Sequence, residues 1–318
     1  QGLPSFKEVI LKIGETYKQQ REEIIKQSPI ISKNLELRKS SVLDQSLEDI
    51  LQNIIVNLDK EKGGYKGAPK FPIFNIYDTL LYFFTKTKNP IYLEPVELIL
   101  KQLCSQGIYD HVEGGLSRYT IDENWLIPHF EKMLYDNAQF ILLLSKFLKI
   151  NKNQYFEKKI IKIINFINKN FLNPEYNLLG TAYDADSDGE EGKYYVFNYN
   201  ELKNIKDVEK YFDVKPEGNW ENKIILKEIK TPPESIIVEL KELRKKKNKP
   251  FFDSKVQLDL NCIWVSALIA AEKILPNNNY QKLAETYYNN LEKLFFKGDK
   301  LFHSSSKTSV YLEDYAYA

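Results

Sequence analysis

The residue types best suited to chemistry lie in residues 114–138, where a loop with two glycines leads into a helix-forming segment. His129, Lys132 and Asp136 are spaced i, i+3 and i+7, so in a helix they share one stripe, with Tyr135 at its edge. An imidazole beside a lysine and a carboxylate is suited to proton transfer near neutral pH, because its reference pKa is about 6.5. The alternative interpretation is a solvated helix face without chemistry.

A second concentration of carboxylates occupies residues 183–192. Asp184, Asp186 and Asp188, followed by a glycine, imitate the opening of an EF-hand loop, but the twelfth position holds a tyrosine where calcium requires a bidentate glutamate. Three interpretations stay open, namely a calcium site, an acidic turn without chemistry, and carboxylates that line a cavity. In the third case they could perform acid–base chemistry on a sugar or bind its hydroxyl groups.

Two later segments carry polar residues at predicted helix starts. Asp259 suits a helix N-cap, an explanation that does not extend to the nearby Lys255. Glu313 and Asp314 begin the last predicted helix, where the helix dipole favours acidic residues without any function. Each of these residues therefore has a structural interpretation or a functional one.

His111 and His303 are isolated in the sequence, and such histidines are more often exposed or internally hydrogen-bonded than ligands. Three scattered histidines without metal-ligand spacing argue against zinc. The sequence contains no Walker loop, no G-x-G-x-x-G after a predicted strand and no G-x-S-x-G elbow. We therefore predict neither a metal nor a cofactor.

Hydrophobic periodicity predicts a series of helices that position these residues. The predicted ranges are about 5–27 with Ser5 as N-cap, 44–58, 75–88, 91–106, 129–149, 154–171, 233–247, 259–275, 279–296, and a last helix from 312. Strand-forming residues 194–197 and the preceding turn residues predict a β-hairpin over 178–198. Short helix connections alternate with long, glycine-rich loops, which is typical of a helical-hairpin (α/α) barrel or toroid with functional loops at one end. A bundle or globin-like fold is the alternative.

The composition is that of a globular protein, with 318 residues, 43% apolar and 28% charged side chains, and a net charge of +1. This balance gives no electrostatic argument for nucleic acid or an anionic membrane, and no stretch of about 18 apolar residues could cross a bilayer. Cys104 and Cys262 lie in apolar helical contexts, so we expect buried thiols and a cytoplasmic setting. We expect neither nucleic-acid nor membrane partners.

Five motifs together resemble one protein family. They are GGYKGAPKFP, GGLSRYTIDENWLIPHFEKMLYDNA, AYDADSDGEEGKYYVF, GNWENKIIL and LEDYA, in this order along the chain. They resemble the thioredoxin-domain-containing proteins of the spermatogenesis-associated, YyaL-like group, over residues 1–318. The resemblance implies an N-terminal thioredoxin-like domain followed by a six-hairpin (α/α) barrel, similar to N-acylglucosamine 2-epimerases and six-hairpin glycosidases.

The sequence departs from this family pattern at three places. Only the closing helix of the thioredoxin-like domain is expected, with its linker in residues 1–38, and the barrel domain in residues 39–318. The family's Asp-Trp-Asn-Gly block is Asp-Leu-Asn-Cys at residues 259–262, which removes a stacking surface. The sequence ends just after LEDYA, so we expect a barrel that is incomplete unless another chain or segment completes it.

The resemblance implies a funnel lined by the residues that match family blocks. They are Arg118, Trp125, His129, Lys132, Tyr135, Asp136, Asp184, Asp186, Lys255, Asp259, Asn261, Glu313 and Asp314. We predict a carbohydrate-active protein, either a sugar isomerase or epimerase or a glycosidase, with His129, Asp136, Asp184 and Asp186 as catalytic residues. The other residues would bind a sugar or sugar phosphate, with Tyr119 and Trp125 as stacking surfaces. The alternative is a non-catalytic binding or scaffold domain that associates with a thioredoxin-like redox partner.

Overall fold

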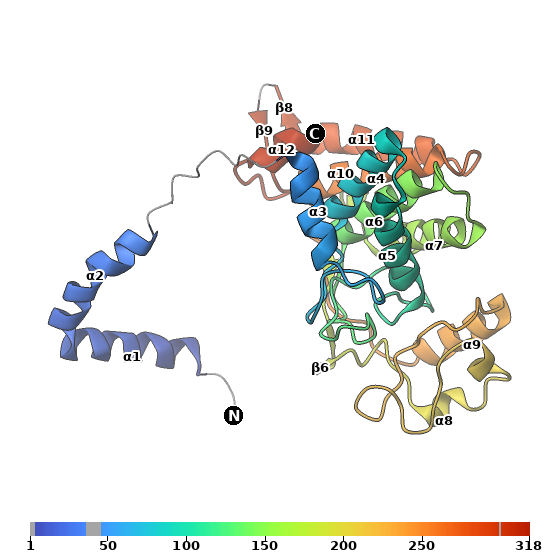
Figure 1. Ribbon diagram of the computed structural model, residues 1–318, viewed down its shortest axis with the longest axis horizontal. Helices are drawn as coiled ribbons and strands as arrows, with labels where there is room; N and C mark the ends of the chain where they lie inside the picture. The colour runs from blue at the N-terminus through green and yellow to red at the C-terminus, as the bar shows by residue number, and fades with distance from the viewer. Residues whose placement is uncertain (1–3, 36–45, 299) are drawn as a thin grey trace. The chain divides into compact units, whose positions relative to one another are not determined.

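The computed structural model describes residues 4–35, 46–298 and 300–318, and it divides into two units, Gln1–Ile50 and Leu51–Ala318 (Figure 1). The structure is mainly helical, which confirms the predicted fold class. The predicted assignment of residues 1–38 to a thioredoxin-like domain stays a prediction, and its linker falls partly outside the described residues.

The N-terminal unit contains helices α1 (Phe6–Gln19) and α2 (Arg21–Leu35). The predicted N-cap is confirmed, because the Ser5 hydroxyl accepts from the Glu8 backbone N–H and the Glu8 carboxylate accepts from the Ser5 backbone N–H. The prediction of one helix over residues 5–27 is wrong, since Gln20 leaves helical geometry with φ −124° and separates the two helices. Within this unit α1 buries none of its residues.

The rest of the chain forms helical hairpins and short helices. Their bounds are α3 (Leu47–Asn57), α4 (Phe74–Thr87), η1 (Pro90–Tyr92), α5 (Glu94–Ser105), α6 (Leu134–Leu148), α7 (Gln154–Asn170), α8 (Tyr199–Leu202), η2 (Val208–Lys210), α9 (Glu234–Arg244), α10 (Leu258–Glu272), α11 (Tyr280–Phe295) and α12 (Leu312–Tyr317). Helices α4, α6, α10 and α12 contact one another in that order, whereas α5, α7 and α11 each pack on the helix before them. This inner row with an outer row is the arrangement of an (α/α) toroid, as predicted.

Helices α6 and α10 form the centre of the inner row. Both are buried on most sides, and residues 262–265 of α10 are an unbroken run of buried apolar side chains, with Trp264 and Leu268 fully shielded from solvent. Helices with this much apolar surface must be enclosed by other elements, which explains why these two helices make the most extensive helix–helix contact of the described chain. Cys104 and Cys262 are free and buried, as predicted.

Nine two-residue strands connect the helices. They are β1 (Lys132–Met133), β2 (Leu172–Asn173), β3 (Leu178–Leu179), β4 (Ala182–Tyr183), β5 (Asp186–Ser187), β6 (Glu190–Glu191), β7 (Phe252–Asp253), β8 (Phe296–Lys297) and β9 (Lys300–Leu301) among the residues described. Strand β4 pairs antiparallel with both β1 and β7, so β1 and β7 run parallel to each other. Because β1 leads into α6 and β7 leads into α10, the N-terminal ends of both helices follow strands that finish at the same end of the sheet, on opposite sides of β4.

The predicted β-hairpin over residues 178–198 is confirmed only in a narrower range, as the pair β5–β6 with Asp188 and Gly189 at its turn. Both turn residues have positive φ, as a tight hairpin of this type requires. Residues 194–197 form no strand, because the backbone turns here and the N–H groups of Tyr195 and Val196 both donate to the Gly192 carbonyl; Phe197 makes only an isolated bridge with Ile224.

The segment with α8, η2 and α9 has a small core of its own, in which Phe197, Phe212 and Leu240 are buried together. Figure 1 shows this segment beside the helical hairpins, at the lower right. None of the helices in residues 4–35, 46–298 and 300–318 is both long and apolar enough to cross a membrane.

Candidate functional site

Two extended segments, residues 118–121 and 127–131, pair with each other and position the first group of polar side chains. The Arg118 N–H donates to the Glu131 carbonyl, and the His129 N–H donates to the Tyr119 carbonyl, each at 3.0 Å. The carboxylate of Asp122 closes the connecting turn by accepting from the backbone N–H groups of Asn124, Leu126 and Ile127. The backbone is thus committed to strand-like pairing before α6 begins.

The His129 cluster consists of Arg118, Tyr119, His129, Glu131 and Glu191. His129 Nδ1 lies 2.9 Å from Glu191 Oε1, and its Nε2 lies 4.0 Å from Glu131 Oε2. Arg118 Nη1 is 3.6 Å from the same Glu131 oxygen, and the Tyr119 ring stacks on the His129 ring at 4.9 Å. The His129 side chain is 32% exposed, so the cluster is open to solvent on one side.

The hydrogen bond to Glu191 determines the tautomer of His129. A carboxylate can only accept, so Nδ1 carries the proton in this bond. The other nitrogen, Nε2, is then the one that can accept a proton from a ligand. This arrangement of an imidazole oriented by a carboxylate is typical of proton-transfer sites.

Asp136 lies in the first turn of α6 and is the most unusual carboxyl group of the site. Its side chain is buried, and its Oδ2 has no hydrogen-bond partner. Burial raises the pKa of Asp136 to about 7, against a smaller lowering by Arg118 and with a further increase from Glu131. Arg118 itself keeps a raised pKa, because the effects of Tyr135, Asp136 and Glu131 outweigh its partial burial. Asp136 can therefore exchange a proton near neutral pH.

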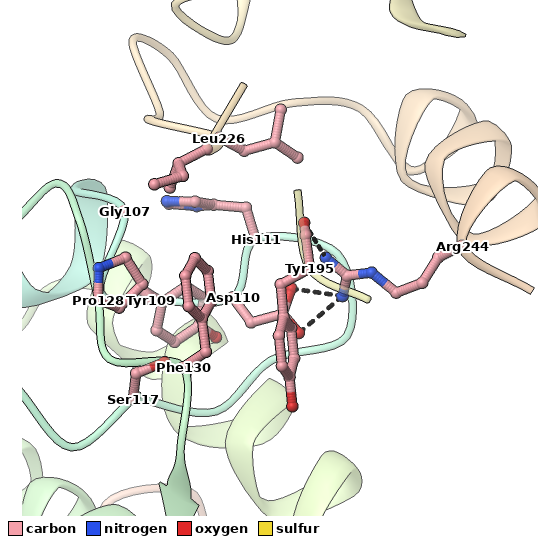
Figure 2. Close-up of a pocket in the computed structure, with 11 residues that line it drawn as sticks. Gly107, Tyr109, Asp110, His111, Ser117, Pro128, Phe130, Tyr195, Leu226 and Arg244 are labelled. Carbon is pink, nitrogen blue, oxygen red and sulfur yellow. Dashed lines mark hydrogen bonds and ion pairs between the residues drawn. The ribbon is translucent and has the colours of Figure 1, made fainter. Parts of the chain in front are cut away.

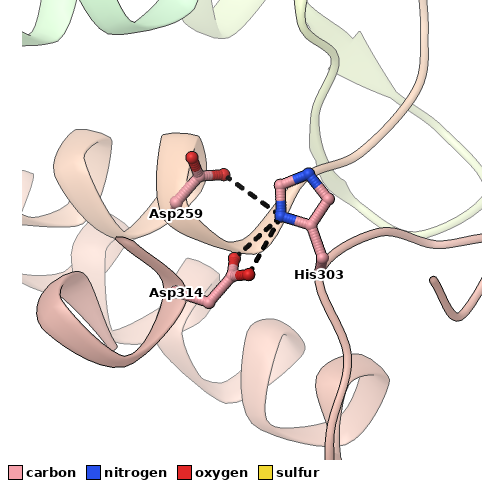
Figure 3. A group of neighbouring side chains, drawn as sticks. All are labelled: Asp259, His303 and Asp314. Atoms are coloured by element: carbon pink, nitrogen blue, oxygen red, sulfur yellow. Dashed lines mark hydrogen bonds and ion pairs between the residues drawn. The ribbon is translucent and has the colours of Figure 1, made fainter. Parts of the chain in front are cut away.

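A second polar group joins the starts of α10 and α12. The His303 Nδ1 lies 2.9 and 3.0 Å from the two oxygens of Asp314, and 4.0 Å from Asp259 Oδ1 (Figure 3). Burial raises the pKa of Asp259, and the negative charge of Asp314 adds to this increase. The segment of His303 is held beside α10 by the hydrogen bond from the Leu258 N–H to the His303 carbonyl at 2.9 Å.

The predicted helical stripe of His129, Lys132 and Asp136 is wrong. Residues 129–133 are not helical, because Phe130 has φ +50°, Lys132 and Met133 form β1, and α6 begins only at Leu134. Pairing with residues 118–120 and with β4 takes up the backbone groups that a helix would use. The side chains of His129 and Lys132 consequently point into different surroundings.

Lys132 lies in a buried group with Asp110 and Arg244, not in a funnel. Its Nζ donates to Asp110 Oδ2 at 2.7 Å and to the Gly114 carbonyl at 2.9 Å, and no part of its side chain is exposed. Arg244 reaches both oxygens of the same Asp110 at 2.7 Å from the other side (Figure 2). These cations hold the pKa of Asp110 well below its usual range, although burial alone would raise it. The role of Lys132 as a ligand-binding residue is not supported by this geometry.

The cavity beside this group is small. It is lined by residues that include Tyr109, His111, Phe130 and Tyr195, and its volume of about 20 Å³ is room for one water molecule (Figure 2). A sugar ring does not fit such a space, so this cavity belongs to the structural interior.

Asn261 was predicted to bind substrate, but its amide group is used inside the protein. It is buried, accepts from the Leu179 N–H, and donates to the Leu179 carbonyl and to the Gln257 carbonyl, all at 2.9 Å. Asn137 makes the same three contacts in α6, with Leu116 N–H, Leu116 carbonyl and Met133 carbonyl. We call Asn137 and Asn261 the asparagine clamps, because each side chain binds both the N–H and the carbonyl of one distant leucine. The shared pattern Leu-x-x-Asn at the start of both helices is the sequence signal that could have identified them.

Trp125 is also structural. Its ring is fully buried and its indole N–H donates to the Lys62 carbonyl at 2.9 Å, which is incompatible with the predicted role as a ligand-stacking surface. Tyr119 keeps that role as a prediction, because it is only partly buried and stacks on Phe71 at 4.5 Å.

The acidic hairpin contributes a carboxylate to His129, but through a residue that was not predicted. Asp184 and Asp186 are exposed, and Asp184 Oδ1 accepts from the backbone N–H of Ala185 and Asp186. Glu191 on β6 is the residue that reaches His129. Its position within the acidic segment was visible in the sequence, but the pairing depends on how the hairpin folds over residue 129.

Three further predicted site residues, Tyr135, Lys255 and Glu313, differ in their exposure. Tyr135 is partly buried beside Arg118, and burial raises its pKa. Lys255 and Glu313 are exposed, and their predicted roles stay predictions. His303 was not predicted as a site residue, and no sequence signal joins it to Asp259 and Asp314, because the three come from separate segments.

Comparison with known proteins gives relatives of greater length. No family model matches the chain. Human spermatogenesis-associated protein 20 is 30% identical over 219 residues, which cover 63% of this chain and 28% of that protein. The uncharacterized protein B0495.5 of Caenorhabditis elegans is 27% identical over 328 residues, which cover 86% of this chain and 44% of that protein. The chain thus spans less than half the length of these curated relatives, and its membership of the specific family stays a prediction.

Solved structures with a similar backbone fold include a sugar epimerase and a mannanase. Cellobiose 2-epimerase from Spirochaeta thermophila has a TM-score of 0.39 at 13% identity, over 93% of this chain and 91% of that chain. The GH76 α-mannanase BT2949 from Bacteroides thetaiotaomicron has a TM-score of 0.48 at 13% identity, over 79% and 56%. These TM-scores are too low to assign a function, which has to be argued from the site itself.

Proposed function

We propose that this chain acts on carbohydrates by acid–base chemistry, as a sugar isomerase or epimerase or as a glycoside hydrolase. The observation that carries the proposal is Asp136, a buried carboxyl group with one unpartnered oxygen and a pKa of about 7. A carboxyl group in this state can give or accept a proton at neutral pH, which general acid–base catalysis requires.

His129 is the second proton-transfer group of the proposal. With Nδ1 donating to Glu191, its Nε2 is left to accept a proton from a substrate and to return it. Arg118 connects the two groups, because it lies 3.6 Å from Glu131 and its charge lowers the pKa of Asp136. A guanidinium that is still partly exposed suits a hydroxyl, carboxylate or phosphate oxygen of the ligand.

The choice of carbohydrate as substrate class is supported by the neighbouring aromatic rings. Phe71 is 44% exposed and stacks on Tyr119, which stacks on His129. Aromatic surface next to carboxylates and an arginine fits a ligand with one apolar face and an edge of hydroxyl groups. Isomerisation and epimerisation require proton transfer beside a carbonyl group, whereas hydrolysis requires an acid at the glycosidic oxygen, and Asp136 suits either role.

The decisive experiment measures both reactions on a panel of reducing sugars, sugar phosphates and oligosaccharides. In D₂O an isomerase or epimerase exchanges the proton at C2, which NMR detects, and a hydrolase releases new reducing ends. We expect Asp136→Asn and His129→Gln each to lower kcat/KM by about 10²- to 10⁴-fold. Glu292→Gln, an exposed carboxylate-to-amide change on α11, is the matched control and should leave the rate unchanged.

The pH profile provides a second readout of the same variants. Wild type should show a titration near pH 7 that is absent in Asp136→Asn, because Asp136 is the group with that pKa. Equal rates in wild type and both site variants would contradict the proposal, as would the absence of both turnover and saturable binding for every sugar tested.

A non-catalytic binding role is the second candidate, and helix α1 favours it. Phe6, Ile10, Ile13 and Tyr17 recur at helical spacing, and α1 buries none of its residues within its own unit. An apolar helix face of this kind fits a protein partner, for which a thioredoxin-like domain is our proposal. Stable co-purification with such a domain, lost in Ile10→Glu while sugar turnover is absent, would favour this role over the enzymatic one.

A further inference from the structure

Asp259, His303 and Asp314 form a group that the proposed function does not use. They come from the first turn of α10, the segment after β9 and the first turn of α12. One ligand atom from each side chain lies within 4.8 Å of the others, and no second group of three or more such side chains converges in residues 4–35, 46–298 and 300–318. Figure 3 shows both carboxylates turned toward the same ring nitrogen.

The separations fit a shared ion. His303 Nδ1 lies 2.9 Å from Asp314 Oδ1 and 4.0 Å from Asp259 Oδ1. Two ligand atoms that are each about 2.1 Å from one ion are separated by about 3–4 Å. The three side chains therefore need only small adjustments, without movement of the helices that carry them.

The charges in this group are not balanced by the protein. Within the described part of the chain, neither Asp259 nor Asp314 forms an ion pair with a lysine or arginine, so two carboxylates share one imidazole. In addition, Asp259 Oδ1 is shielded from solvent and has no hydrogen-bond partner. A buried carboxylate oxygen in this state is unfavourable unless a cation or donor is supplied.

Gln257 provides the outer contact that metal-binding histidines usually have. Its Nε2 is 2.8 Å from His303 Nε2, and its Oε1 is 3.5 Å from the hydroxyl of Thr181. When Nδ1 binds an ion, Nε2 carries the proton, and a 180° rotation of the amide places Oε1 there to accept it. The rotated NH₂ group then faces the Thr181 hydroxyl, so both orientations satisfy the amide.

We propose that Asp259, His303 and Asp314 bind a divalent transition-metal ion. One imidazole nitrogen with two carboxylate oxygens suits zinc or manganese better than calcium or magnesium, which prefer oxygen ligands alone. Three protein ligands leave at least one position for water or a ligand, and the side chains of His303 and Asp259, at 15% and 17% exposure, are accessible to an ion. The site uses no residue of the proposed acid–base pair and stands independently of it.

The test measures metal content directly. The full chain is stripped with a chelator, dialysed against Zn²⁺ or Mn²⁺, and analysed by mass spectrometry of the elements. We expect one equivalent in wild type, and at least a 10-fold weaker Kd in His303→Gln and Asp259→Asn. His129→Gln removes a histidine that also contacts a carboxylate, so it is the matched control and should keep one equivalent. Asp314 is left unchanged, because it also accepts from the Tyr311 N–H and caps α12.

A second measurement does not depend on how stable the variants are. Each protein is compared with itself, and its Tm is followed as Zn²⁺ is added. Tm should rise with the logarithm of the zinc concentration in wild type and His129→Gln, and stay constant in Asp259→Asn. Less than stoichiometric metal in wild type, or equal metal content in wild type and His303→Gln, would overturn the proposal. Neither result bears on sugar turnover, so the two proposals fail separately.

Discussion

The buried group of Asp110, Lys132 and Arg244 and the partly exposed cluster around His129 each take a residue from the segment 129–132, but their charged side chains differ in how far they are paired. In the buried group, both Asp110 oxygens accept from Arg244, and Lys132 donates to Asp110 and to a backbone carbonyl. In the His129 cluster, the ion pairs are longer and the side chains reach solvent.

This difference separates structural charge from charge that is available to a ligand. The ammonium group of Lys132 donates to Asp110 and to the Gly114 carbonyl, both inside the protein, and it also lies over the Phe166 ring at 4.2 Å. Asp136, four residues further on, has an oxygen without a hydrogen-bond partner, and its pKa of about 7 allows the carboxyl group to lose its proton near neutral pH. A charged residue type alone therefore does not indicate function, whereas an unused hydrogen-bonding position at a perturbed pKa does.

The largest effect should come from breaking the buried group. Asp110→Asn leaves Lys132 and Arg244 without their shared carboxylate, and we expect a loss of about 3–5 kcal/mol in the free energy of unfolding. The matched change in the open cluster, Glu131→Gln, should cost less than about 1 kcal/mol, because exposed ion pairs contribute little. Urea unfolding followed by circular dichroism measures both, and similar losses would show that the two regions do not differ as described.

The second-largest effect is expected for Asp136→Asn, which should gain stability over wild type as pH rises. The pKa of Asp136 is about 7 when folded and near 3.8 when unfolded, so between pH 4 and pH 7 the folded state holds a proton that the unfolded state releases. Wild type therefore loses stability as pH rises through this window, and Asp136→Asn does not. We expect the variant to be up to about 4 kcal/mol more stable above pH 7 and nearly equal to wild type below pH 4.

Unfolding curves of both proteins at pH 4, 6 and 8 test this expectation. Asp110 has the reverse sign, because its lowered pKa gives stability that is present above pH 3.8 and is lost as pH falls. If Asp136→Asn showed a constant difference from wild type at all three values, Asp136 would not be a carboxyl group with a raised pKa.

A smaller loss is expected from the two asparagine clamps. Asn137→Ala leaves the N–H and carbonyl of Leu116 without partners, and Asn261→Ala does the same to Leu179. We expect each change to cost about 2–3 kcal/mol in the free energy of unfolding. The double variant should show the sum, because the clamps hold different segments. A negligible cost in Asn261→Ala would return this residue to the group that is free to bind substrate.

The smallest effect on stability is expected for His129→Gln. The side chain is partly exposed and its contact is with the exposed Glu191, so the free energy of unfolding should change by no more than about 0.5 kcal/mol. Equilibrium unfolding measures this change in stability, and the activity assay shows whether the same variant loses turnover while its stability is kept. A large loss of stability in His129→Gln would place His129 with Lys132 as a structural residue.

The sequence by itself determined most of the helices and the segment, residues 114–138, that holds several candidate site residues. The 3.6-residue period of apolar residues in α4, α5, α7 and α11 reflects burial of one face of each helix, which is a local property of the sequence. The density of polar types in residues 114–138 likewise indicated Arg118, His129 and Asp136, and the structure brings Arg118 close to both Glu131 and Asp136.

Only the tertiary structure decided which of these polar residues are free. The segment 129–133 has a helical pattern but pairs with residues 118–120 and with β4, because these pairings satisfy its backbone groups. That extended course sends Lys132 into the interior and leaves His129 at the surface. Hydrogen bonding to distant carbonyls likewise explains Asn261 and Trp125, whose acceptors, the carbonyls of Leu179 and Lys62, lie 82 and 63 residues away.

The convergence of Asp259, His303 and Asp314 is the clearest case of what the sequence alone could not show. Its members lie on α10, a loop and α12, and their spacing along the chain matches no metal motif. They meet because α12 packs against α10, and because the segment of His303 is hydrogen-bonded beside the start of α10. Local patterns record which face of a helix is buried, whereas the meeting of separate segments depends on packing of the whole fold.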